Sequence, residues 1–432
     1  MVKRILKGLF VIGFLFQAGP LWADRLRSVT GTPEEQTRAV NVNFKAIDHE
    51  LSNTVHKTST ETISGYKYFT NNADFTTVTA DTVTATNIVM DSPFSMRNRI
   101  INGDMRLDQR LAGTASGNNP TYYVDRWRFD SSGAVVVRGQ QSSSIVPASF
   151  NFSSSSTIIT ADASMSGGDY LILIQPIEGY NVADFLYGTS LAKSATLSFW
   201  IRTDVAGTYS GSLRNSAANR SYVFTYTIDA VDTWEQKKIT ISGDTSGTWL
   251  STNGVGIYLQ FCFGVGTTLS TSSVNSWVSG NFIGSTSQTN NLIGTAGNQY
   301  FLTGVQLEEG EVATPFERRF FPVELQLCQR YYEKSYNLGT AAGATTTVGR
   351  FFGSRQSGTF VAFVIFKTRK RAAPTMTIWS DVTGAAGFIR NQASSADEAA
   401  GTETSEHGVN VNGTTATVGH GITFQWAADA EL

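Results

Sequence analysis

The 432-residue chain has few of the side chains on which metal and redox sites depend: two cysteines and four histidines. Cys262 lies in an apolar run and Cys328 in a segment with a helical pattern, so we expect two small buried side chains and no disulfide. His407 and His420 are separated by a stretch rich in Gly and Thr, which disfavours a shared metal ion. We therefore expect neither a metal site nor a cofactor.

Signatures of catalysis are also scarce. The chain has no Gly-x-Ser-x-Gly elbow, phosphate-binding glycine loop or zinc-ligand spacing. A glycosidase needs only two carboxylates at the right separation, so Glu308 with Glu309, or Asp125, stay open as candidates. We favour a structural interpretation, in which Asp125 pairs with Arg126 and the two glutamates end a strand. No enzyme activity is expected.

Charge is low and nearly balanced. Charged residues make up 16% of the chain, below the roughly 25% usual for soluble domains, and the net charge is -2. This balance gives no reason to expect a nucleic-acid partner. The 40 glycines and abundant Ser and Thr instead indicate many short strands and turns.

Residues 1–23 have the layout of a secretory signal. Lys3, Arg4 and Lys7 precede an apolar run at residues 8–16, which is shorter than the about 20 residues needed to span a bilayer. Leu21 is bulky where a cleavage site prefers a small residue. We favour a cleaved or membrane-inserted leader; the alternative is a hydrophobic end buried in a larger assembly.

Residues 24–56 are predicted to form an attachment and oligomerisation helix. Thr32 and Glu35 form a capping box, and Pro33 suits the first turn. Apolar residues then recur with the spacing of a coiled-coil seam, at Val40, Phe44, Ile47 and Leu51. Two heptads do not hold a lone helix together in water, so we favour self-association over packing against a neighbouring domain.

Residues 57–96 form a Thr-rich segment predicted to be a shaft. Val78, Val83 and Ile88 recur every five residues among β-branched threonines. Such a strip buries too little apolar surface to fold alone, but three intertwined chains would bury it along a shared axis. A homotrimer is the favoured interpretation, and an extended linker is the alternative.

The rest of the chain is predicted to be mainly β. Short apolar or alternating segments bounded by Gly, Ser and Asn fill residues 97–320, which favours a jelly-roll sandwich. Residues 321–432 include a short helical connector beginning at Pro322, and further strand patterns there predict a smaller C-terminal β-sandwich domain. We expect this terminal domain to be the receptor-binding domain that touches the host surface. The predicted strands lie at residues 133–138, 170–174, 195–202, 222–228, 234–241, 255–263, 300–307, 359–366, 371–378, 387–389 and 422–426.

Several motifs resemble phage and prophage tail fibres that carry a jelly-roll, carbohydrate-binding-like module. They are residues 98–110 (NRIINGDMRLDQR) with 124–127 (VDRW), residues 304–310 (GVQLEEG), 314–317 (TPFE) and 327–332 (LCQRYY), and, more distally, 57–69, 371–375 (RAAPT) and 427–432. The resemblance implies that the opening Asn-Gly segment and the closing Val-Gln-Leu-Glu strand lie close together. It also implies a receptor-binding virion protein that attaches to a tail or baseplate protein through its N-terminus.

A sugar site needs a flat aromatic platform with polar side chains at its edge, because sugars present apolar C–H faces and a ring of hydroxyls. The candidates in or near predicted loops of the jelly roll are Tyr122, Tyr123, Trp249, Tyr258 and Trp277. A second set in the C-terminal domain consists of Phe351, Phe352, Arg355 and Trp379. Trp127, Trp200 and Trp234 lie inside apolar strand patterns and are expected to be more buried.

The sequence thus predicts a tail-fibre virion protein that binds host surface polysaccharide without cutting it. The leader departs from the family pattern, because virions assemble in the cytoplasm and an exported fibre would be lost to assembly. The alternative is therefore a secreted bacterial carbohydrate-binding or adhesin-like protein of prophage origin, located outside the cell.

Overall fold

The computed structural model describes residues 96–116, 121–289, 292–355, 360–414 and 418–432. The predicted leader, attachment helix and most of the shaft lie outside the described residues. The same holds for the oligomerisation stripe from Val40 to Ile88. These assignments stay predictions.

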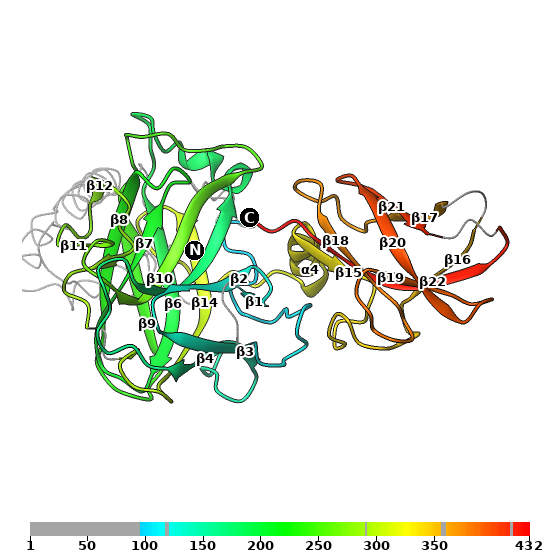
Figure 1. Cartoon of the computed structure of the whole chain (residues 1–432). Coiled ribbons are helices and arrows are strands. Elements are labelled where there is room, and N and C mark those ends of the chain that lie inside the picture. The colour runs from blue at the N-terminus through cyan, green and yellow to red at the C-terminus, as the bar shows by residue number, and fades with distance from the viewer. Residues whose placement is uncertain (1–95, 117–120, 290–291, 356–359, 415–417) are drawn as a thin grey trace, which may run out of the picture. The chain divides into compact units, whose positions relative to one another are not determined.

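Two antiparallel sheets form a sandwich within residues 97–310 (Figure 1). The seven-stranded sheet has the order β1-β2-β5-β10-β7-β8-β12, and the five-stranded sheet has the order β3-β4-β14-β6-β9. The strands of the first sheet are β1 (Thr121–Val124), β2 (Trp127–Ser132), β5 (Tyr170–Glu178), β10 (Val255–Val265), β7 (Gly207–Arg214), β8 (Arg220–Ile228) and β12 (Trp277–Ser279). Those of the second are β3 (Val136–Ser142), β4 (Ser153–Thr160), β14 (Gln299–Glu309), β6 (Ala195–Thr203) and β9 (Glu235–Ile241).

The core lies between the two sheets. Alternate residues of facing strands supply it, such as Leu171 and Leu173 of β5 and Leu197 and Phe199 of β6. Trp127 is fully buried there as predicted, whereas Trp200 and Trp234 are half-buried. The prediction of a mainly β, jelly-roll-like sandwich is therefore confirmed.

The outer face of the seven-stranded sheet is partly covered as well. Ile172 and Ile174 of β5 point away from the main core and pack with Cys262, Val265 and Ile283. The covering chain includes a small parallel sheet of β11 (Ser270–Thr271) and β13 (Gly284–Ser285). β5 and β10 are consequently apolar on both faces, which explains why their sequences read as nearly continuous apolar runs.

The C-terminal strands have a hydrophobic cluster of their own, which includes Val364, Ile389, Val411 and Phe424. The last strand, β22 (Gly421–Asp429), pairs with β15, β18, β16 and β19. The sheet also contains β20, β21 and β17. The bounds are β15 (Tyr332–Lys334), β16 (Phe351–Ser354), β17 (Phe360–Ile365), β18 (Thr375–Trp379), β19 (Phe388–Asn391), β20 (Ala396–Thr404) and β21 (Gly408–Gly413).

A single turn-rich connection joins the two sets of strands. The predicted connector is helix α4 (Phe321–Gln329), with Pro322 in its first turn. The helix ends at Gln329, and Tyr332 begins strand β15. The domain boundary drawn at residue 320 stays a prediction.

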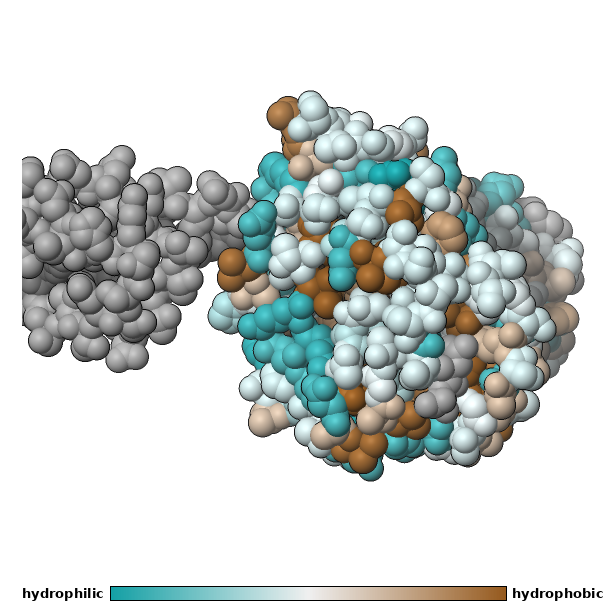
Figure 2. Space-filling view, turned by 90° about the vertical axis from the view of Figure 1, so that its left-hand side faces the viewer, coloured by the Kyte–Doolittle hydropathy of each residue, from teal (hydrophilic) through white to brown (hydrophobic). Residues whose placement is uncertain are grey.

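Both cysteines are free and buried, as predicted. Burial raises the pKa of the Cys262 thiol to about 12. Among the described residues, no helix is long and apolar enough to cross a bilayer. One face of the molecule, shown in Figure 2, carries apolar residues in small separate patches among polar side chains.

Candidate functional site

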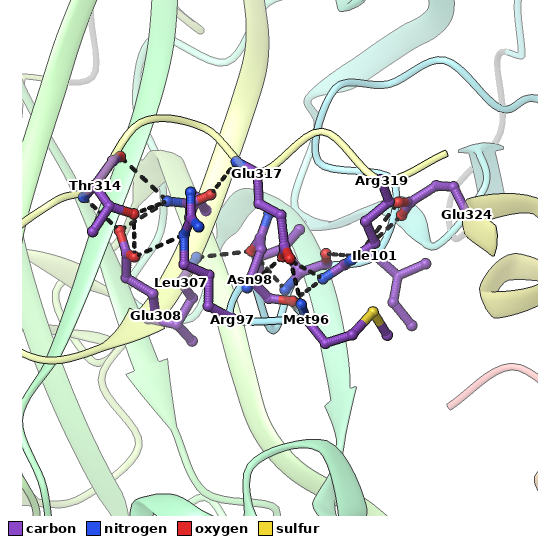
Figure 3. Close-up of polar contacts among 12 residues, drawn as sticks. Met96, Arg97, Asn98, Ile101, Leu307, Glu308, Thr314, Glu317, Arg319 and Glu324 are labelled. Carbon is purple, nitrogen blue, oxygen red and sulfur yellow. Dashed lines mark hydrogen bonds and ion pairs between the residues drawn. The ribbon is translucent and has the colours of Figure 1, made fainter. Parts of the chain in front are cut away.

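The opening and closing motifs lie side by side, as the resemblance predicted (Figure 3). The side chain of Asn98 reaches the closing strand β14: its Nδ2 donates to the carbonyl oxygen of Val305 at 3.1 Å, and its Oδ1 accepts from the amide of Leu307 at 3.1 Å. The amide of Val305 donates to the carbonyl oxygen of Gly103 at 2.9 Å. The two motifs therefore form one closed structural unit.

Charged residues of these motifs complete the same unit. The Glu308 carboxylate is buried and accepts from the amide and the hydroxyl of Thr314, at 2.9 and 2.6 Å. Arg319 donates to the carbonyl oxygen of Ile100 at 3.0 Å and lies 3.3 Å from Glu324 of α4. Both oxygens of the Glu308 carboxylate thus accept hydrogen bonds that hold the loop after β14 in place.

Asp125 and Arg126 also have structural partners, but they do not pair with each other as the sequence analysis proposed. Asp125 accepts from the backbone amide and side chain of Gln109, at 2.9 and 2.6 Å. Arg126 instead pairs with Glu431 and stacks 3.5 Å from the ring of Tyr331. The backbone at Arg126 is left-handed, with φ of 73°.

Polar and aromatic side chains gather at the surface in a different place, a groove on the outer face of the seven-stranded sheet. The groove has a volume of about 250 Å³. It crosses strands β2, β5, β10 and β7 and is bordered by the chain around β11 and β13. Its lining consists of Arg128, Asp130, Tyr170, Ile172, Ile174, Arg214, Tyr258, Gln260, Leu269, Asn281 and Ile283.

Strand alternation places these side chains. Leu173 and Phe129 point into the core, so their neighbours Ile172, Ile174, Arg128 and Asp130 point outward. Register then aligns them across the sheet. Arg128 lies opposite Ile174, and Ile174 lies opposite Gln260. An apolar floor with polar walls results.

Two tyrosines with polar neighbours stand on this floor. The Tyr170 hydroxyl donates to Asp130 Oδ1 at 3.2 Å, and burial, followed by Asp130, raises the pKa of that tyrosine. The Arg214 guanidinium lies 5.1 Å from the ring centroid of Tyr258. Both rings are half-buried, so each keeps part of its surface open to the groove. This is the combination of flat apolar surface and hydrogen-bonding edge that a sugar ring requires.

Of the five aromatic candidates predicted in the jelly roll, the structure places only Tyr258 in the groove. Tyr122 lies beside it on β1, with the Arg128 guanidinium 5.6 Å from its ring, but its hydroxyl donates to the carbonyl oxygen of Leu432 at 3.1 Å. Tyr123 is fully buried and stacks on Phe129 with centroids 4.7 Å apart. The Tyr123 ring therefore has no exposed face for a ligand.

Trp249 and Trp277 belong to an aromatic cluster away from the groove. Each indole meets the ring of Tyr187 edge-on, at 5.1 and 5.6 Å. Their Nε1 atoms donate to the carbonyl oxygens of Ser246 and Ser242. Both tryptophans are partly buried against the core, so their main contacts are structural.

The C-terminal candidates are not brought together as a platform. Phe351 stacks on Phe424 at 4.9 Å, whereas Phe352 is 67% exposed on the same strand. Arg355 is buried and pairs with Glu398 at 2.8 Å. Trp379 is half-buried and packs edge-on against Tyr336 with ring centroids 6.0 Å apart. Phe352 alone among them presents most of its surface to solvent.

Sequence reasoning missed most of the groove, including Tyr170, Arg128, Asp130 and Arg214. A usable signal was present in the alternation of β2, where Arg128 and Asp130 flank the apolar Phe129. Asp130 is the one carboxylate among the lining residues. Within the described part of the chain, no three His, Cys, Asp or Glu side chains group as they would around a metal ion.

No protein-family model and no curated protein matches the chain. Three similar solved structures are the enzymatically active domain of tailspike protein 4 from bacteriophage CBA120, a family 11 carbohydrate-binding module from Clostridium thermocellum and a "putative sugar binding protein" from Bacteroides thetaiotaomicron. Their identities are 12% each, and their TM-scores are 0.27, 0.24 and 0.26. The alignments cover 50%, 46% and 49% of this chain, and 22%, 98% and 100% of the other chains. Similarity at this level defines neither a family nor a ligand.

Proposed function

We propose that the protein binds polysaccharide through the groove on the outer face of the seven-stranded sheet and acts there without cutting its ligand. The observation that carries this proposal is the lining: two half-open tyrosine rings on an apolar floor, bordered by Arg, Asp, Gln and Asn side chains. A sugar chain laid in the groove would place its C–H faces on the rings and its hydroxyls on the polar edge.

The biological setting we propose is a phage or prophage tail fibre that binds host surface polysaccharide during adsorption. This part rests on the motifs of the sequence, and the closed unit around Asn98 accounts for the pairing of the opening and closing motifs. The N-terminus would attach to a tail or baseplate protein, and three chains would share one stalk. Three weak sites on one stalk raise avidity by about 100-fold or more when the receptor is dense.

A secreted bacterial carbohydrate-binding protein of prophage origin is the second candidate, because residues 1–23 have the layout of an export signal. The two settings differ in a processing step. Mass spectrometry of the protein recovered from expressing cells would find cleavage after Ala23 in the secreted protein, and an intact N-terminus in a virion component.

The binding proposal predicts that Tyr258→Ala lowers the affinity for polysaccharide by roughly 10-fold or more, because the ring surface that a sugar would bury is lost. The comparison uses a polysaccharide that the unaltered protein binds. A panel of purified bacterial surface polysaccharides, with affinity measured by calorimetry, provides the test. Tyr180→Ala is the matched control, since Tyr180 is 61% exposed on the same sandwich but outside the groove. Unchanged affinity in Tyr258→Ala together with loss in Phe352→Ala would move the site to the C-terminal strands.

The trimer proposal predicts that full-length protein sediments with the mass of three chains. Val83→Lys would introduce a charge into the predicted apolar stripe and is expected to yield single chains. Thr84→Lys, one position away and outside the stripe, is the control and should leave the trimer intact. A single-chain mass for the unaltered protein would contradict the proposal.

A further inference from the structure

We propose that the groove recognises an acidic glycan, and that Arg128 and Arg214 bind carboxylate groups of its sugar residues. This inference rests on the proposed function, since it names the chemical class of the ligand for the same groove.

The positive charges in the groove lining outnumber the negative ones. Its lining contains two arginines and one carboxylate, Asp130, which already accepts from the Tyr170 hydroxyl. Neither Arg128 nor Arg214 lies within 4.0 Å of a carboxylate oxygen anywhere in the described residues, whereas most other arginines there do. The groove therefore holds one uncompensated positive charge beside an apolar floor.

The donors of these two arginines are also incompletely used. The Nε atoms of Arg128 and Arg214 are buried without a hydrogen-bond partner, as are those of some ion-paired arginines such as Arg106 and Arg319. Arg214 donates through Nη1 to Asn281, a neutral side chain. Burial lowers the pKa of Arg214, consistent with a charge that lacks a strong partner. Because a guanidinium has five N–H donors in a planar fork, a carboxylate in the groove that binds bidentately through the Nη groups would compensate the charge.

The positions of the arginines suit a chain of sugars that lies across the strands. Arg128 is on β2 and Arg214 on β7, and β5 and β10 lie between them. Three strand spacings separate their backbones by roughly 14 Å. Register places Tyr258 directly beside Arg214 on the neighbouring strand, and Tyr170 opposite Ser132, four residues along β2 from Arg128. A sugar stacked on Tyr258 would therefore hold an acidic group beside Arg214, and a further sugar of the chain, across β5, would reach Arg128.

A neutral glycan would gain little from this arrangement. A hydroxyl group forms no ion pair with a guanidinium, and holding two guanidinium groups beside apolar side chains with only one carboxylate, Asp130, in the lining is costly. The aromatic contacts of the arginines, 5.6 Å to Tyr122 and 5.1 Å to Tyr258, instead keep each planar group fixed before the ligand arrives.

The test uses the full chain and a glycan panel that contains oligogalacturonate, sialylated oligosaccharides and the same glycans with their carboxylates reduced to alcohols. We expect binding to at least one carboxylated glycan, loss of at least 10-fold affinity after carboxyl reduction, and a similar loss in Arg128→Gln and in Arg214→Gln. Affinity should also fall as salt is raised. Lys238→Gln is the charge-matched control, because Lys238 is exposed on β9 of the other sheet. Thermal unfolding of each variant verifies that it is folded.

The outcomes separate the inference from the function on which it rests. Equal affinity for a glycan and its carboxyl-reduced form, or unaltered affinity in both arginine variants, would overturn acidic recognition while polysaccharide binding stands. Absence of binding to every glycan of the panel and to intact surface polysaccharides would overturn both.

Discussion

Gly103→Ala is expected to lower the free energy of unfolding by about 3 to 5 kcal/mol. Gly103 lies in the opening motif, and a methyl group built on its Cα would overlap the carbonyl oxygen of Val305 in the closing strand. Its own carbonyl oxygen accepts from the amide of Val305 at 2.9 Å. The backbones would have to separate, which breaks this bond and leaves buried polar groups without partners. Urea unfolding followed by tryptophan fluorescence measures the effect.

Gly168→Ala is the matched control in the same sandwich. The nearest atom to a methyl group on Gly168 would be the Thr268 hydroxyl oxygen at 3.9 Å, so there is room for it. Its free energy of unfolding should stay within about 0.5 kcal/mol of the unaltered protein. If both variants were equally stable, the close approach of the two motifs would not hold the sandwich together.

The strands that the sequence predicted well are those with apolar side chains on both faces or in strict alternation. The apolar runs at residues 170–174 and 255–263 became β5 and β10, and the segment at residues 422–426 became part of β22. Such segments bury enough apolar surface to form strands whichever strands they pair with. The local apolar pattern therefore predicts them correctly.

Other strands were missed because their buried positions hold small polar residues. β4 begins with four serines, all buried between β3 and β14. The hydroxyl of Ser154 meets that of Tyr123, and Gly211 of β7 faces the ring of Phe224 so closely that a methyl group would overlap it. Side chains from other parts of the chain leave room only for small residues at these positions. The local pattern of apolar residues therefore does not predict these strands.

The site was harder to predict than the fold for a related reason. Aromatic residues in predicted loops, such as Trp249 and Trp277, looked available but form a cluster with Tyr187. The groove side chains lie inside strands and face outward by strand alternation, and the chain around β11 and β13 covers part of the same face. Which outward positions stay open depends on that cover, a tertiary feature that strand alternation alone does not supply.

Glu333→Gln is expected to destabilise the C-terminal strands by about 3 to 5 kcal/mol. Glu333 and Lys370 are both fully buried and their charged groups lie 2.6 Å apart. The two carboxylate oxygens also accept from the amides of Lys367 and Thr368, at 3.0 and 3.4 Å. An amide side chain would turn one NH₂ group toward these donors and leave the Lys370 charge without its anion. Guanidinium unfolding of the two proteins gives the difference.

The loss should depend on pH in a definite direction. Burial lowers the pKa of Lys370 from its usual 10.5, and Glu333 opposes the shift. A lysine with a lowered pKa binds fewer protons in the folded than in the unfolded state, so the free energy of unfolding rises with pH between the two pKa values. Without Glu333 the folded-state pKa falls further, which widens that window toward neutral pH. The destabilisation should therefore be largest at neutral pH and shrink as the pH approaches 10.5.

Two further variants decide whether the buried pair is the cause. Glu406→Gln breaks an ion pair with Arg369 that is exposed on the same set of strands, and it should change stability little. Adding Lys370→Met to Glu333→Gln removes the unpaired lysine charge, so the double variant should be more stable than Glu333→Gln alone. Its loss of stability relative to the unaltered protein should also no longer depend on pH in the way described above. A double variant that is no more stable than Glu333→Gln would show that the lost amide contacts, rather than the unpaired lysine, account for the destabilisation.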